Sequence, residues 1–164
     1  MKAKLMHKVC DATEKCGEVV QVECDGIVIA AELVKCSIEE LASKEEVDVD
    51  VTFFCHAKYG VYENEEEYYE SGECMAAESY IPVGAMSEVH EGDEPSPMNL
   101  INLVVKDIVE NPKAPEEYLL LHGKVCDATL DVVIRCEDAE EKAAVKPGNI
   151  ISGLYWAELK LLNK

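Results

Sequence analysis

The sequence predicts an all-β protein with one or two short helices and a barrel-like architecture. One observation is a hydrophobic period of two, as in EEVDVDVTFFC at residues 45–55, which is the pattern of a half-buried strand. A second is that such segments recur at short intervals between clusters of turn-forming residues. The third is that helical patterns are few and short. Short strands at regular spacing with little helix favour a barrel or a sandwich.

Six segments carry the strand pattern. Alternation places Val20, Val22 and Cys24 on one face of the earliest segment, and Val132 and Ile134 on one face of a later one. Other segments are assigned from their β-branched and aromatic residues, which are enriched in strands. The predicted strands are residues 19–24, 47–55, 99–109, 117–126, 132–136 and 149–162.

Two short helices and four turns are expected between these strands. Ser37 and Glu40 have the S-x-x-E spacing of a capping box, which predicts a helix that runs to about Ser43. The segment 137–145 predicts a second helix, which the sequence KPGN ends. Clusters of Gly, Pro, Asn and Asp predict turns or loops at residues 24–26, 70–73, 91–97 and 110–115.

The hexapeptide KVCDAT occurs twice, at residues 8–13 and 124–129. We interpret it as the same strand and turn used twice, with cysteine filling a small core position. The repeat predicts two related halves, an N-terminal one at 1–94 and a C-terminal one at 95–164, within one compact unit. The order of strands and short helix predicted over 98–162 resembles a small OB-type barrel in architecture, although no family motif accompanies it.

The chain is strongly acidic. It carries 34 Asp and Glu against 15 Lys and Arg, a formal net charge of −19, and its one arginine is Arg135. Such a field repels phosphate backbones and anionic membranes and favours a basic partner. The sequence has no hydrophobic stretch of the roughly 20 residues that a membrane span needs, and no export signal was found at the N-terminus. A cytoplasmic location with eight reduced cysteines is therefore expected.

The sharpest local feature is the segment YGVYENEEEYYESGE at residues 59–73, in which four tyrosines are interleaved with six glutamates. One interpretation is a solvated hairpin loop whose tyrosines pack at its base. The functional interpretation is a protein-interaction surface, since exposed tyrosine is a strong anchor and surrounding acid steers a basic partner. The residues proposed for this surface are Tyr62, Tyr68, Tyr69, Glu65, Glu66 and Glu67. A homo-oligomer is a further option.

Two aromatic residues in the last predicted strand, Tyr155 and Trp156, predict an alternative function. In an OB-like barrel they would stack on bases of single-stranded nucleic acid or on another ligand. The excess of acid opposes this, because such binding depends on Lys and Arg neutralising phosphates. The competing interpretation is that Trp156 is buried, because it shares strand parity with Ile150 and Leu154.

A cysteine-dependent enzyme or redox protein is the third alternative. A histidine precedes each KVCDAT copy, His7 before the first and His122 before the second. Imidazole, thiol and carboxylate groups therefore lie close in sequence at each copy. In a strand, however, His122 and Cys126 lie about 13 Å apart, and neither motif supplies the depressed thiol pKa that a nucleophile needs. No close-spaced ligand pair typical of zinc sites occurs either. We therefore expect a non-enzymatic binding module with no catalytic residue, metal or cofactor.

Overall fold

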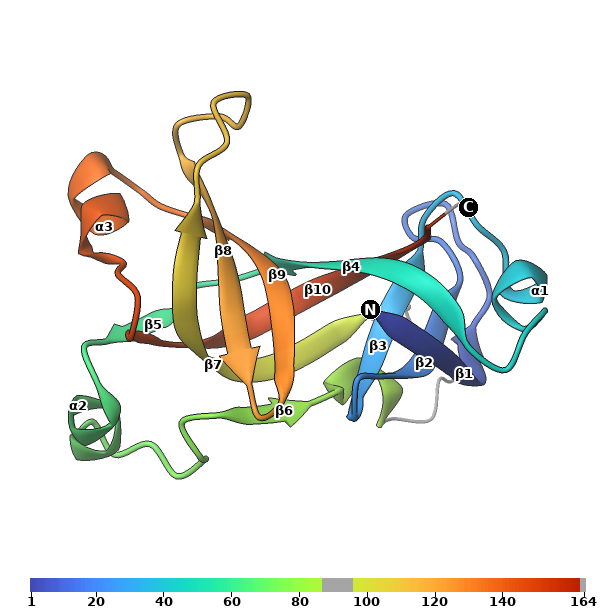
Figure 1. The fold of residues 1–164 in the computed structure, drawn as a ribbon, viewed down its shortest axis with the longest axis horizontal. Helices are drawn as coiled ribbons and strands as arrows, with labels where there is room; N and C mark the ends of the chain where they lie inside the picture. Colours follow the sequence, from blue (N-terminus) through green and yellow to red (C-terminus); the bar gives the residue numbers. More distant parts are fainter. Residues whose placement is uncertain (87–95, 163–164) are drawn as a thin grey trace. The chain divides into compact units, whose positions relative to one another are not determined.

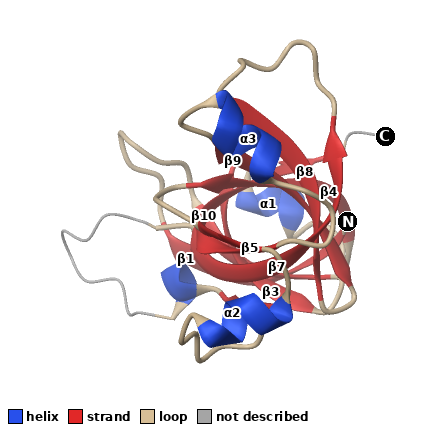
Figure 2. Ribbon diagram, turned by 90° about the vertical axis from the view of Figure 1, so that its left-hand side faces the viewer, coloured by secondary structure: helices blue, strands red, loops and turns tan. Residues whose placement is uncertain are grey.

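The computed structural model describes residues 1–86 and 96–162, and most of these lie in ten β-strands (Figures 1 and 2). Three short α-helices and a 3-10 turn (η1, Val83–Ala85) complete the described elements. The helices are α1 (Ile38–Leu41), α2 (Glu65–Glu70) and α3 (Ala139–Ala144). The strands are β1 (Lys2–Cys10), β2 (Val19–Cys24), β3 (Ile27–Leu33), β4 (Val47–Cys55), β5 (Gly60–Tyr62), β6 (Ser79–Ile81), β7 (Met98–Val109), β8 (Tyr118–Val125), β9 (Ala128–Arg135) and β10 (Ile150–Leu161).

The chain forms two compact units, each built from separate segments. Unit 1 comprises residues 1–52, 81–100 and 156–164, and unit 2 comprises 53–80 and 101–155. The expected boundary between residues 94 and 95 lies outside the described residues. The element order β1–β2–β3–α1–β4 recurs later in the chain as β7–β8–β9–α3–β10. Strands β4, β6, β7 and β10 each contribute residues to both units.

Unit 1 contains a closed ring of five strand segments. The antiparallel meander β1–β2–β3 continues through a parallel pairing of β3 with β10, in which Glu32 lies opposite Glu158. Strand β10 then pairs with β4, where the backbone N–H of Leu162 donates to the carbonyl of Asp48 at 2.9 Å. Strand β4 returns to β1, with Lys2 opposite Asp48. One face of each strand in this ring points inward and contributes to the core of unit 1.

The predicted strand faces in unit 1 are confirmed. Val20, Val22 and Cys24 are buried, and Val47, Val49 and Val51 alternate with half-buried residues along β4. The turn between β2 and β3 consists of Asp25 and Gly26, both at positive φ, as a two-residue hairpin turn requires. The predicted capping box is present at α1, where Ser37 and Glu40 bond to each other's backbone N–H.

Unit 2 is built on the antiparallel meander β7–β8–β9. In the strand order β9 lies next to β4, which pairs with β10 through the N–H of His56 and the carbonyl of Leu154 at 2.9 Å. Strand β10 pairs in turn with β7, where the N–H of Val105 donates to the carbonyl of Asn149 at 2.8 Å. Strand β5 adds to β10. Val132 and Ile134 point into the core as predicted, and α3 lies inside the predicted 137–145 segment.

The two KVCDAT copies occupy different local structures, so the prediction of one strand and turn used twice is wrong at this level. In the first copy Cys10 ends β1 and is half-buried, and an eight-residue connection follows. In the second copy Cys126 and Asp127 form the turn of the β8–β9 hairpin, in which Val125 pairs with Ala128. Cys126 has a φ of 52° and is exposed, so it fills no core position.

Strand β10 faces the core with the parity opposite to the one predicted for Trp156. The buried residues are Ile151, Tyr155, Ala157 and Leu159, whereas Leu154 is exposed and Trp156 is half-buried. Ile150 is also buried, so both faces are apolar at the start of the strand and parity alone does not identify the core side.

Candidate functional site

The tyrosine- and glutamate-rich segment contains a helix instead of the expected hairpin loop. Helix α2 begins after Asn64, whose side chain accepts a hydrogen bond from the N–H of Glu67 at 3.0 Å. The Glu67 carboxylate in return accepts from the N–H of Glu63. The bond to Asn64 satisfies an N–H group that the first helical turn would leave unpaired, and the bond to Glu63 ties the preceding residue to the helix. Acidic residues in that turn also suit the positive end of the helix dipole.

Tyr68 anchors α2 in unit 2. Its side chain is completely buried and packs with Ala77 and Ile150. Its hydroxyl lies 2.8 Å from Nδ2 of the buried Asn102 on β7. The ring of Tyr62 meets that of Tyr68 edge-to-face, with centroids 5.1 Å apart. Tyr68 is therefore a packing residue and offers no surface to a partner.

The buried Asn102 organises the segment that follows α2. Its Nδ2 atom also lies 3.0 Å from the carbonyl oxygen of Ala76 and 2.8 Å from the hydroxyl of Ser79. Sequence reasoning missed this residue. The available signal was a polar residue inside an apolar strand, since NLINLVV (99–105) reads as buried β-structure with two asparagines in it. Buried amides of this kind are held by hydrogen bonds.

The outward side of α2 carries the remaining predicted residues. Tyr69 is 48% exposed, and its ring meets Tyr68 at a centroid distance of 5.1 Å. The Tyr69 hydroxyl accepts a hydrogen bond from the N–H of Ala77 at 3.1 Å, which fixes the ring. Glu65, Glu66 and Glu70 are exposed, and within the described residues their carboxylates make no hydrogen bond or ion pair. We call Glu65, Glu66, Tyr69 and Glu70 the α2 surface.

The α2 surface lies in a stretch without positive charge. Residues 59–80 contain seven glutamates and no lysine or arginine. Three of these glutamates have partners, since Glu67 accepts from the N–H of Glu63, Glu73 accepts from the Tyr62 hydroxyl at 3.1 Å and Glu78 pairs with Lys124 at 3.2 Å. Of the six residues predicted for an interaction surface, Tyr69 and the three glutamates 65–67 are exposed, Tyr62 is half-buried and Tyr68 is buried.

The two aromatic residues predicted to stack on bases or a ligand are both engaged in the fold. Tyr155 is fully buried, and burial raises the pKa of its hydroxyl. The Trp156 indole N–H donates to one carboxylate oxygen of Glu32 at 2.8 Å, while the other oxygen accepts from the N–H of Gly17 at 2.6 Å. The Glu32 carboxylate on β3 thus joins the indole on β10 to the β1–β2 connection of unit 1. The ring of Tyr155 has no exposed face for a base.

The cysteines are free thiols, and those with shifted pKa values move away from reactivity. Burial, as the largest cause, raises the pKa of Cys24 and Cys16 to about 12, with Glu32 adding to the effect at Cys16. Burial also raises the pKa of Cys10, Cys36 and Cys55. Nucleophilic cysteines need the opposite shift.

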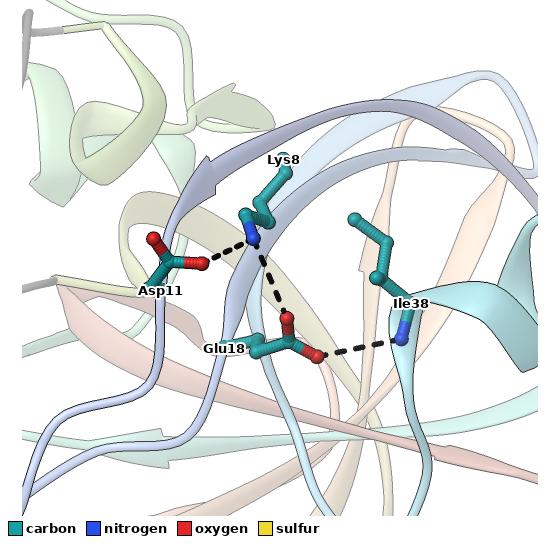
Figure 3. A network of polar contacts seen from close by, with 4 residues as sticks. All are labelled: Lys8, Asp11, Glu18 and Ile38. Carbon is teal, nitrogen blue, oxygen red and sulfur yellow. Dashed lines mark hydrogen bonds and ion pairs between the residues drawn. The ribbon is translucent and has the colours of Figure 1, made fainter.

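Burial outweighs the charge of Lys8, which favours the Cys10 thiolate, so the pKa of Cys10 is raised overall. The Lys8 ammonium group lies between the carboxylates of Asp11 and Glu18, the latter at 3.6 Å (Figure 3). Glu18 also accepts a long hydrogen bond from the N–H of Ile38 at 3.4 Å, which links the β1–β2 connection to the start of α1. This network is structural. In residues 1–86 and 96–162 no three His, Cys, Asp or Glu side chains converge as a metal site.

No protein family, curated protein or solved structure matches this chain at a significant level. Within the described part of the chain, every helix is too short or too polar to cross a bilayer.

Proposed function

We propose that this chain is a non-enzymatic cytosolic binding module that offers the α2 surface to a basic protein partner. The observation that carries the proposal is a fixed aromatic ring, Tyr69, beside three unpartnered carboxylates on a helix anchored by the buried Tyr68. Aromatic residues are favoured anchors at interfaces, because they bury a large area with few rotatable bonds. The acidic surround would speed encounter with a basic partner and exclude acidic ones.

We further propose that both units are OB-type barrels that arose by duplication. The recurring order of three strands, a short helix and a long strand supports this, as does the ring β1–β2–β3–β10–β4. Barrels of this class commonly serve as binding modules, which agrees with a non-enzymatic role. Fold class alone does not identify what is bound, so the function is argued from α2.

The test uses affinity capture from extract of the source cells with two variants of equal charge. The first variant neutralises the α2 surface by changing Glu65, Glu66 and Glu70 to glutamine. The control makes the same net-charge change at three exposed glutamates elsewhere, namely Glu14, Glu45 and Glu140. Tyr69→Ala forms a third variant, because it removes the anchor and leaves the charge unchanged.

We expect the α2 variant and Tyr69→Ala each to reduce capture of the partner at least about tenfold, while the control retains it. Wild-type capture should weaken as salt rises, since exposed charges are screened. An equal loss of capture in both triple variants would show that net charge alone drives binding. Full capture by Tyr69→Ala would show that Tyr69 is not an anchor. Circular dichroism of each variant checks that the fold is kept.

A further inference from the structure

Unit 2 contains a cleft of about 690 Å³ that the proposed function does not use. Three segments form it, namely the end of β4 with the residues that follow it, the residue before β8, and the end of β9 with the start of α3. The side chains on which the inference rests are Lys58, Tyr59, Glu117, Arg135 and Glu137. The volume lies within the range of about 300–1,000 Å³ that is usual for ligand sites.

Hydrogen bonds tie the three walls together. The Tyr59 hydroxyl donates to the carbonyl of Arg135 at 3.1 Å and lies 3.6 Å from the sulfur of the buried Cys136. The Cys136 N–H donates to the carbonyl of Glu117 at 2.7 Å. The cleft is therefore preformed, which lowers the entropy cost of binding.

The cleft carries charge of both signs without internal pairing. Arg135 is the one arginine in the sequence, and within the described residues neither its guanidinium nor the Lys58 ammonium makes an ion pair. The same holds for the carboxylates of Glu117 and Glu137. Glu141 differs, because its carboxylate accepts from the N–H of Glu137. Two cations and two carboxylates thus remain for a ligand.

This charge pattern selects the ligand class. A polyanion would meet the −19 field of the protein and two carboxylates in the cleft. A zwitterion carries no net charge, and its two charged ends can pair with the cations and the carboxylates of the cleft at the same time. Arginine binds carboxylates with paired hydrogen bonds, and capture of chain termini is an established mode of peptide recognition. A free amino acid would leave much of the volume empty.

We propose that this cleft binds a short zwitterionic peptide, with its carboxylate at Arg135 and Lys58 and its ammonium group at Glu117 and Glu137. Tyr59 and the half-buried Cys55 then contact the middle of the peptide. The site is separate from the α2 surface in its residues and in its ligand.

The experiment is an NMR titration of the ¹⁵N-labelled full chain with three matched peptides. Tetra-alanine carries both end charges, its C-terminal amide lacks the carboxylate, and its N-acetyl form lacks the ammonium group. We expect tetra-alanine to shift amides of residues 55–59 and 135–141 in a saturable way. Each capped peptide should bind at least about tenfold more weakly, the size expected for losing one charged hydrogen bond.

A thermodynamic cycle assigns the carboxylate contact. Arg135→Gln should weaken the binding of tetra-alanine about tenfold. It should leave the affinity for the amidated peptide unchanged, because that peptide has no carboxylate to contact Arg135. Lys113→Gln is the matched control, since Lys113 is exposed and does not line the cleft. The proposal fails if the three peptides bind with equal affinity, or if Lys113→Gln weakens binding as much as Arg135→Gln. It also fails if no amide chemical shifts change, or if the changes lie outside residues 55–59 and 135–141.

Discussion

Removing the Tyr68 hydroxyl should cost far less stability than removing the Asn102 amide that contacts it. The Asn102 NH₂ group has two protons, and three acceptors lie within 3.0 Å of its nitrogen. Tyr68→Phe deletes one acceptor and leaves two for two protons. The expected loss is therefore at the low end of a single hydrogen bond, about 0.5 kcal/mol.

Larger losses are expected from two related changes. Asn102→Ala leaves the fully buried Tyr68 hydroxyl without its partner, which costs about 1–3 kcal/mol. Tyr68→Ala removes a buried aromatic ring from the contact with Ile150 and Ala77, which costs about 3–5 kcal/mol. The predicted order of destabilisation is Tyr68→Phe, then Asn102→Ala, then Tyr68→Ala.

The assay is equilibrium unfolding in urea, followed by circular dichroism and by the fluorescence of Trp156. Trp156 belongs to unit 1 and the mutated residues to unit 2. Coincident transitions would justify two-state free energies, whereas separate transitions would mean that each unit needs its own. If Tyr68→Phe destabilised the protein as much as Asn102→Ala, the surplus-acceptor argument would be refuted.

Three further changes probe other parts of the fold. Burial raises the pKa of Cys24 from its ordinary value near 9 to about 12, so its contribution to stability should be constant below pH 9 and fall by up to about 1.4 kcal/mol per pH unit as pH rises toward 12. Cys16 and the other buried thiols add to this decline, so Cys24→Ala should make it less steep in urea titrations from pH 8 to 11 without abolishing it. The buried Asn99 side chain bonds both the N–H and the carbonyl of Ala30, so Asn99→Ala should lower the free energy of unfolding by about 2 kcal/mol or more. A Cβ on Gly84 would lie 1.6 Å from the Ser96 carbonyl oxygen, so thermal melts should show Gly84→Ala to be strongly destabilising, and a near-wild-type melting temperature would contradict that packing.

The strands and α1 could be predicted because their signals are local. Alternation between apolar and polar residues determines a strand and its buried face together, as at Val47, Val49 and Val51. The Ser37 and Glu40 capping box likewise needs only residues three apart. These features depend little on distant parts of the chain, so a single sequence is enough to find them.

Helix α2 was not predicted, although a local signal existed. Asn64 and Glu67 have the spacing of a capping pair, and glutamate is a good helix former. A six-residue helix is unstable in isolation. It persists because Tyr68 is buried near Asn102, and these residues lie 34 positions apart in the sequence. No local pattern reveals that contact, so the segment resembled a solvated loop.

The orientation of Trp156 could not be predicted for a different reason. Both faces of β10 begin with a large apolar residue, Ile150 on one side and Ile151 on the other. A shift of one residue exchanges the two faces of a strand, so period-two reasoning needs a polar face to choose between them. The choice is made by Glu32, whose carboxylate accepts from the indole N–H. The partner of this bond lies 124 positions away.

Unpaired charge alone supports neither proposal. The chain has 19 more acids than bases, so glutamates without partners are unavoidable, and exposed ion pairs contribute little stability in any case. The α2 surface stands out because buried contacts at Tyr68 hold its carboxylates beside the fixed ring of Tyr69. The cleft stands out because Tyr59 holds the backbone of Arg135 at its wall. Rigidity distinguishes a site from a solvated charge, and for this reason each experiment compares a residue at an anchored position with one of equal charge elsewhere.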